Sequence, residues 1–170
     1  LLAGLVIAST FLLVYQEMMR RGTFRLIALF VTLWTAAASS LHWLARPHVF
    51  TFLFLAIWTY NLEHFVLGKT KQIWRCPCVM LSWANTHGAF IAGFVVWGAY
   101  FIEWAWEFWQ GRTGKKPGIK LGLIGISSFA ITFVNPSGWH LWQTSVGFIG
   151  NNYLVGHTNE YLSPDFQNTF

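Results

Sequence analysis

Charged side chains are scarce in this chain. Aspartate, glutamate, lysine and arginine together make up 10% of its 170 residues, whereas hydrophobic residues make up 55% and aromatic residues 19%. A globular domain in water carries roughly 25% charged residues, because its outer surface has to be solvated. A chain with so little charge cannot cover a water-facing surface. The composition therefore excludes an ordinary water-soluble domain and favours a protein that lies in lipid.

Cysteine is also scarce. The chain has two, Cys76 and Cys78, and both occur in the string CPC. Cysteines separated by a single residue rarely make a good disulfide, and a metal site needs about three or four ligands. We therefore predict neither a disulfide nor a metal bound by these thiols, and interpret them as small side chains at the beginning of a helix.

The positive charge is confined to three short clusters, and only Arg46 lies outside them. The clusters are Arg20, Arg21 and Arg25; Lys69, Lys71 and Arg75; and Arg112, Lys115, Lys116 and Lys120. Short loops rich in lysine and arginine between apolar spans are typical of the cytoplasmic side of a membrane protein. The net charge of +5 is therefore explained without nucleic acid, and we expect the lipid bilayer, not a nucleic acid, as a partner.

The apolar stretches have the length of membrane spans, because a helix rises about 1.5 Å per residue and needs about 20 residues to cross the hydrocarbon core. We predict an all-α, polytopic transmembrane helical bundle of about six spans over residues 1–134. One helix over residues 73–109 would be too long for a bilayer, so a short helical hairpin is expected there, with its tip at residues 85–88. The other predicted spans are 1–16, 24–43, 48–67 and 119–134.

The chain changes character after residue 134, where turn residues, aromatics and short amphipathic stretches are mixed. We expect residues 135–170 to form an extracytoplasmic loop, with a helix near residues 139–148 that lies along the membrane surface. The sequence begins inside an apolar run and ends soon after this loop. We therefore expect it to be a piece of a longer protein.

If the basic clusters are cytoplasmic, the polar side chains of the opposite face form a single group. It includes five of the six histidines and the remaining arginine: His42, Arg46, His48, Asn85, His87, His140, His157, Glu160 and Asp165. An arginine on this side opposes the charge bias of membrane proteins, and an anion such as phosphate or carboxylate would explain it. A helix-end cap remains the alternative for Arg46, and a bond to a backbone carbonyl remains the alternative for His87.

Four strings, taken in order, resemble segments of a group of bacterial polytopic membrane proteins. ARPHVFTFLFLA (45–56) is similar to RPQLFTFLLLA, WANTHGAFIAGFVVWGAY (83–100) to WANLHGGFLLGL, FVNPSGWHLW (133–142) to LNPYGWRLL, and NEYLSPDF (159–166) to SEWQSPDF. Those proteins are placed with the GT-C glycosyltransferases, which are related to the protein mannosyltransferases. The order and the rough spacing match over residues 46–166. Ser137 and Tyr161 depart from the pattern, which usually has tyrosine and tryptophan there.

The resemblance implies a hexosyltransferase of the bacterial cytoplasmic (inner) membrane. It would take a sugar from a polyprenyl-phosphate donor at the extracytoplasmic face. The resemblance assigns Arg46, Asn85 and His87 to donor binding. His48 and His140 are further candidates for substrate binding, because they belong to the same outer group. The catalytic acid of such enzymes lies in a first outer loop, which we expect before Leu1; within this chain Glu160 and Asp165 are the candidates for a general base. The pattern identifies no cofactor and leaves a divalent metal as an open alternative.

Two other functions fit the same sequence. A non-catalytic integral membrane subunit or scaffold would use the same helices to pack against partner helices. A haem-binding bundle would need histidines that face each other within the spans, but most of the histidines lie at span ends on one side, so we do not favour it. Acidic residues in an outer loop upstream of this sequence would favour the enzyme over the scaffold.

Overall fold

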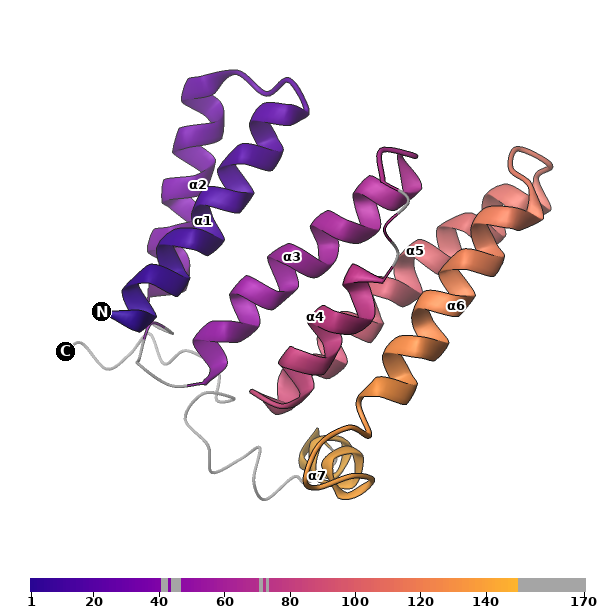
Figure 1. Cartoon of the computed structure of the whole chain (residues 1–170). Helices are drawn as coiled ribbons and strands as arrows, with labels where there is room; N and C mark the ends of the chain where they lie inside the picture. The colour runs from indigo at the N-terminus through magenta and orange to yellow at the C-terminus, as the bar shows by residue number, and fades with distance from the viewer. Residues whose placement is uncertain (41–42, 44–46, 71, 73, 150–170) are drawn as a thin grey trace, which may run out of the picture. The chain divides into compact units, whose positions relative to one another are not determined.

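The structure, a computed structural model, describes residues 1–40, 43, 47–70, 72 and 74–149. Every regular element within these ranges is a helix, which confirms the predicted all-α class (Figure 1). The helices are α1 (Leu2–Arg20), α2 (Arg25–Ser39), α3 (His48–Val66), α4 (Arg75–Ala84), the short 3-10 helix η2 (Gly88–Phe90), α5 (Ile91–Trp109), α6 (Lys115–Ile131) and α7 (His140–Ile149). The chain divides into two compact units, Leu1–Asn135 and Pro136–Phe170, and each is described by itself.

Three segments of the described chain are long and apolar enough to cross a membrane: α1, α3 and the continuous stretch Gly88–Trp109 that joins η2 to α5. This is half the predicted number of spans. The difference lies in the shorter helices, because α2 has 15 residues and α6 has 17. The helix α4 has only 10 residues and rises about 15 Å. It is the short first arm of the helical hairpin, which turns at residues 85–87 before η2 begins.

Large apolar side chains are exposed on several helices of the first unit. On α2 only Ala28 and Thr32 are buried, whereas Phe30 and Trp34 are 64% and 68% exposed. A monomer in water rarely exposes a continuous apolar surface of this kind. In a bilayer such a surface is stable, since lipid tails are as apolar as the side chains themselves. The exposed face of α2 is therefore suited to a lipid environment.

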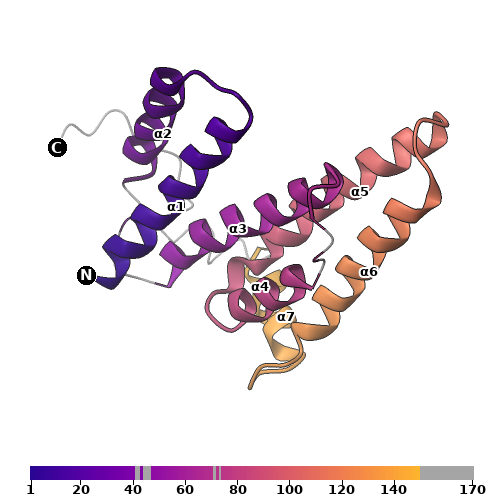
Figure 2. The same cartoon turned by 45° about the horizontal axis from the view of Figure 1, so that its top comes forward.

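The core of the first unit lies around α4, which Figure 2 shows between α3 and α6. The largest fully buried side chains come from these three helices and from η2: Val49, Trp58, Leu62, Met80, Trp83, Phe90, Leu121 and Ile124. The helices therefore pack through one shared apolar interior.

Glycines on α6 allow the tryptophans of α5 to approach its backbone. A Cβ atom at Gly118 would overlap the indole of Trp104, and one at Gly125 would overlap the indole of Trp97. The Trp97 Nε1–H donates to the Leu121 carbonyl at 2.9 Å, so the ring is fixed by a hydrogen bond as well as by contact. Close packing against small residues is typical of helix pairs in membranes.

The three basic turns share one end of the first unit (Figure 1). Arg21, after α1, forms an ion pair with Glu63 in the last turn of α3. Thr70, after α3, lines the same cavity as Thr113, which precedes α6. We call this the basic end, defined by the turns 21–24, 67–74 and 110–114, and the opposite end, with His48 and the turn 85–87, the histidine end. If all three basic turns lie in the cytoplasm, they must lie at the same end of the helical bundle, and this arrangement meets that requirement.

The second unit, as far as residue 149, contains α7. The sequence predicted a helix near residues 139–148, and the helix is confirmed. Trp139, just before α7, is 57% exposed, and Val146 within it is 54% exposed. The placement of this helix along a membrane surface stays a prediction.

Candidate functional site

His87 is held in place by its own turn and by α3. It is the N-cap of η2, and its Nδ1 accepts a hydrogen bond from the Ala89 N–H at 3.3 Å. The Thr51 Oγ1 atom lies 3.1 Å from the same Nδ1, and the Trp83 Nε1–H donates to Thr51 Oγ1 at 3.2 Å. Because Nδ1 accepts from the Ala89 N–H, it carries no proton, and the Thr51 hydroxyl can only act as a donor to it. The geometry favours a neutral His87 whose proton is on Nε2.

His48 adds a second imidazole to this end of the molecule. It begins α3 and precedes Thr51 by three residues, so the two share a helix face. The rings of His48 and His87 have centroids 6.4 Å apart and an interplanar angle of 60°. We call His48, Thr51, Trp83 and His87 the histidine cluster. Imidazole N–H groups can donate hydrogen bonds to phosphate oxygens, and imidazoles can also form hydrogen bonds with sugar hydroxyls.

Asn85 fixes the hairpin turn to the segment that follows α6. Its side chain is exposed, but its Nδ2 donates to the Leu81 carbonyl at 2.9 Å and to the Val134 carbonyl at 3.0 Å. The second bond joins residues 49 positions apart in sequence. Both bonds are made within the protein, so this amide nitrogen positions the turn that carries His87.

The remaining predicted site residues lie in the second unit or outside the described residues. His140 is the first residue of α7, and its Nδ1 lies 2.8 Å from the Gln143 Oε1 atom. Arg46, Glu160 and Asp165 are outside the described residues. The donor phosphate site and the general base therefore stay predictions. Among the residues that the structure describes, no three His, Cys, Asp or Glu side chains gather as metal ligands.

Two members of the histidine cluster, Thr51 and Trp83, were not predicted as site residues. Both lie inside the strings that carry the resemblance, 45–56 and 83–100. Helical spacing from His48 could have identified Thr51 as a neighbour on the same face. No local pattern could have identified Trp83 as its partner, because the two residues are 32 positions apart.

A network of charged and polar groups joins three helices at the basic end. The Arg21 Nη2 atom lies 2.9 Å from Glu63 Oε1, and its Nε–H donates to Glu17 Oε1 at 3.2 Å. The Tyr100 hydroxyl donates to the second oxygen of Glu63 at 2.6 Å. The hydrogen bond with Glu17, and then the charge of Glu63, raise the pKa of Arg21 above its ordinary value. This network offsets the cost of a carboxylate within a mostly apolar helix.

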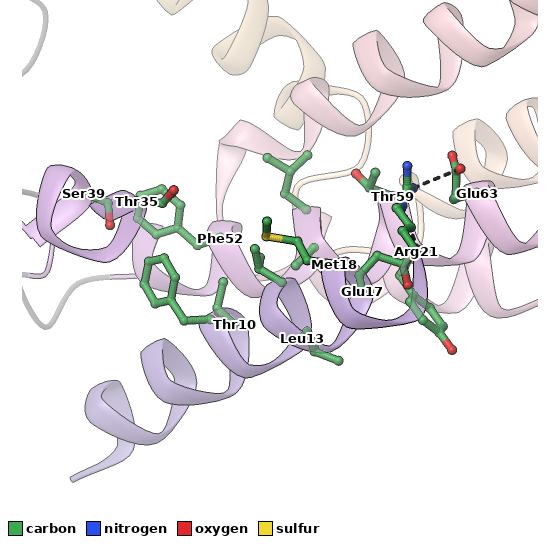
Figure 3. Close-up of a pocket in the computed structure, with 15 residues that line it drawn as sticks. Thr10, Leu13, Glu17, Met18, Arg21, Thr35, Ser39, Phe52, Thr59 and Glu63 are labelled. Carbon is green, nitrogen blue, oxygen red and sulfur yellow. Dashed lines mark hydrogen bonds and ion pairs between the residues drawn. The ribbon is translucent and has the colours of Figure 1, made fainter. Parts of the chain in front are cut away.

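An apolar groove of about 520 Å³ lies between α1, α2 and α3 and ends at this network (Figure 3). Figure 3 shows Thr10, Leu13 and Met18 on the wall formed by α1, and Phe52 and Thr59 on the wall formed by α3. A second cavity, of about 380 Å³, lies next to the groove and is polar. It is lined by Tyr60, Asn61, His64, Lys69, Thr70, Gln72 and Arg75. Tyr60 lines both spaces.

Comparison of the chain with protein-family models, curated proteins and solved structures finds no match.

Proposed function

We propose that this chain belongs to a membrane glycosyltransferase of the GT-C type. The enzyme takes a sugar from a polyprenyl-phosphate donor at the extracytoplasmic face of the bacterial cytoplasmic membrane and transfers it to a lipid, glycan or protein acceptor. In this proposal the chain is a multi-pass bundle of about six spans, and its basic end lies in the cytoplasm because lysine- and arginine-rich turns are retained on that side. The histidine cluster then faces the side on which the donor is used.

The observation that carries the proposal is the meeting of the GT-C-like strings at the histidine end. Thr51, in the first string, contacts His87, in the second, although the two are 36 positions apart. Asn85, also in the second string, bonds to Val134 in the third. A shared donor site needs residues from separate helices at one end of the bundle. Three of the four strings meet this requirement.

The proposed chemistry assigns a role to each group. The acceptor oxygen attacks the anomeric carbon of the sugar, and the bond between that carbon and the phosphate oxygen breaks. Negative charge grows on the departing lipid phosphate, and Arg46 stabilises it. His48 and His87 supply hydrogen bonds to the donor, and His140, in the second unit, stays a predicted donor contact. A carboxylate removes the proton of the acceptor; Glu160 and Asp165 are the candidates within this chain, and the resemblance places the corresponding acid of GT-C enzymes in the first outer loop.

The decisive experiment replaces Arg46 in the intact protein and measures sugar transfer from a polyprenyl-phosphate donor. We expect Arg46→Ala to reduce transfer about 100-fold, which is the size of effect seen when one stabilising donor is removed from a charged transition state. Arg112→Ala removes the same charge from the basic end and should leave transfer unchanged. Normal transfer by Arg46→Ala would reject the phosphate role.

A non-catalytic subunit or scaffold is the second candidate. The hydrogen bonds of Thr51 and Asn85 favour it, because both side chains bond to other parts of the protein, as structural residues do. The two functions differ in what the purified intact protein does alone. An enzyme transfers sugar without a partner. A scaffold transfers none with any polyprenyl-phosphate donor, and instead co-purifies with partner helices through exposed faces such as that of α2.

A further inference from the structure

We propose that the basic end holds one anionic phospholipid, with an acyl chain in the apolar groove between α1, α2 and α3 and its phosphate in the adjoining polar cavity. The proposal rests on one part of the proposed function only, the placement of the basic turns at the level of lipid headgroups. It is independent of sugar transfer, because the histidine cluster lies at the other end of the first unit.

The walls of the groove suit a hydrocarbon chain. Most of its lining is apolar and comes from α1 and α3. Two of its three threonines use their hydroxyl protons on their own helices: Thr10 donates to the Val6 carbonyl and Thr35 to the Val31 carbonyl, each at 2.8 Å. A polar ligand would therefore find few donors along the groove. In a bilayer, an apolar space that opens to lipid is filled by a lipid chain or by another helix.

The adjoining cavity suits an anion. Lys69 and Arg75 line it, and no aspartate or glutamate among the described residues does. The guanidinium carbon of Arg20 lies 5.2 Å from the centre of the Tyr60 ring, so a further cation is present where the two spaces meet. The nearby carboxylates are already paired, Glu17 with both Arg20 and Arg21 and Glu63 with Arg21, so Lys69 and Arg75 are the cations left for an anion. The cavity therefore has an excess of positive charge, which an anion would neutralise.

The position of the cavity and its charge together favour a phospholipid over a partner helix. Trp74 precedes Arg75 and is 73% exposed, and tryptophan is enriched at the membrane interface. Basic pockets between helices on the cytoplasmic side bind anionic headgroups. A partner helix would fill the groove but would leave Lys69 and Arg75 without an anion. A phospholipid fills the groove and supplies the phosphate with one molecule.

The headgroup is tested on the full chain in nanodiscs that contain phosphatidylcholine with a small fraction of phosphatidylglycerol. Native mass spectrometry then counts the phosphatidylglycerol that stays bound. We expect one retained molecule per chain, and we expect Lys69→Gln with Arg75→Gln to weaken its retention about tenfold or more. The matched control, Arg112→Gln with Lys115→Gln, loses the same charge at another basic turn and should retain the lipid. Equal loss in both pairs, or in neither, would overturn the proposal.

The groove is tested by filling it. Ala56, on its α3 wall, is replaced by phenylalanine, and Ala56→Leu serves as a smaller change if the first variant does not fold. Either variant should lose the retained phosphatidylglycerol, whereas Ala99→Phe, on an exposed position of α5, should keep it. Retention by both Ala56 variants would overturn the proposal. So would a disulfide from Ala56→Cys to a second copy or to a partner helix, because the groove would then have another occupant.

Discussion

At the scale of single residues, the hydroxyl of Thr51 connects the indole of Trp83 to the imidazole of His87. Thr51→Val keeps the shape of the side chain and removes both bonds. We expect a loss of about 1–3 kcal/mol in the free energy of unfolding, because two partly buried polar groups lose their partner. Thermal unfolding in detergent measures this loss. Thr35→Val is the matched control, since that hydroxyl bonds only to its own helix, and equal melting temperatures for the two variants would contradict the role given to Thr51.

The same residues show what sequence can and cannot predict about a site. His48 and His87 were predicted to share a face because charge bias fixes which ends of the helices lie together, and the structure places their rings in contact range. The partners of these residues were not predictable. Thr51 and Trp83 are ordinary residues in apolar strings, and their contact depends on how α3 packs against α4, which no local pattern encodes. The hydrogen bond from Asn85 to the Val134 carbonyl depends in the same way on how α6 packs.

At the scale of helices, the packing of α5 against α6 depends on the absence of a side chain at Gly125. Gly125→Ala places a Cβ atom into the indole of Trp97, and overpacking of this kind costs about 1–3 kcal/mol. Gly122→Ala is the control on the same helix, because no atom lies within 4 Å of its new Cβ. It should be neutral or stabilising, since alanine favours a helix over glycine by about 1 kcal/mol. Unfolding midpoints that rank the two variants in the opposite order would refute this packing.

The helices themselves were largely predictable, and their lengths less so. Apolar length and the three basic clusters predicted a hairpin over residues 73–109 with its tip at 85–88, and the chain turns there between α4 and η2. The sequence did not predict that α2 would end at Ser39. Apolar composition continues beyond that residue, and composition alone does not mark where backbone hydrogen bonding stops. A count of apolar stretches therefore gives more spans than a count of long helices.

At the scale of the whole molecule, the crossing of α6 decides whether the basic end and the second unit lie on opposite sides of a membrane. With 17 residues the helix rises about 26 Å, somewhat less than the hydrocarbon core of about 30 Å. Lysine side chains near its start can reach the interface and extend its effective length. Thr132 is fully buried just after its end, so the helical packing continues beyond Ile131. We therefore expect α6 to cross.

Side-specific labelling tests this crossing in intact cells. Cysteine is introduced by Lys115→Cys or by Glu160→Cys, in a background where Cys76 and Cys78 are alanine, and a membrane-impermeant thiol reagent is applied from outside. We expect labelling at position 160 and none at position 115 until the membrane is permeabilised, because a single crossing separates the two. Labelling of both positions from one side would place Glu160 and Asp165 with the basic turns. The donor site proposed at the histidine end would then have no carboxylate from this chain on its side of the membrane.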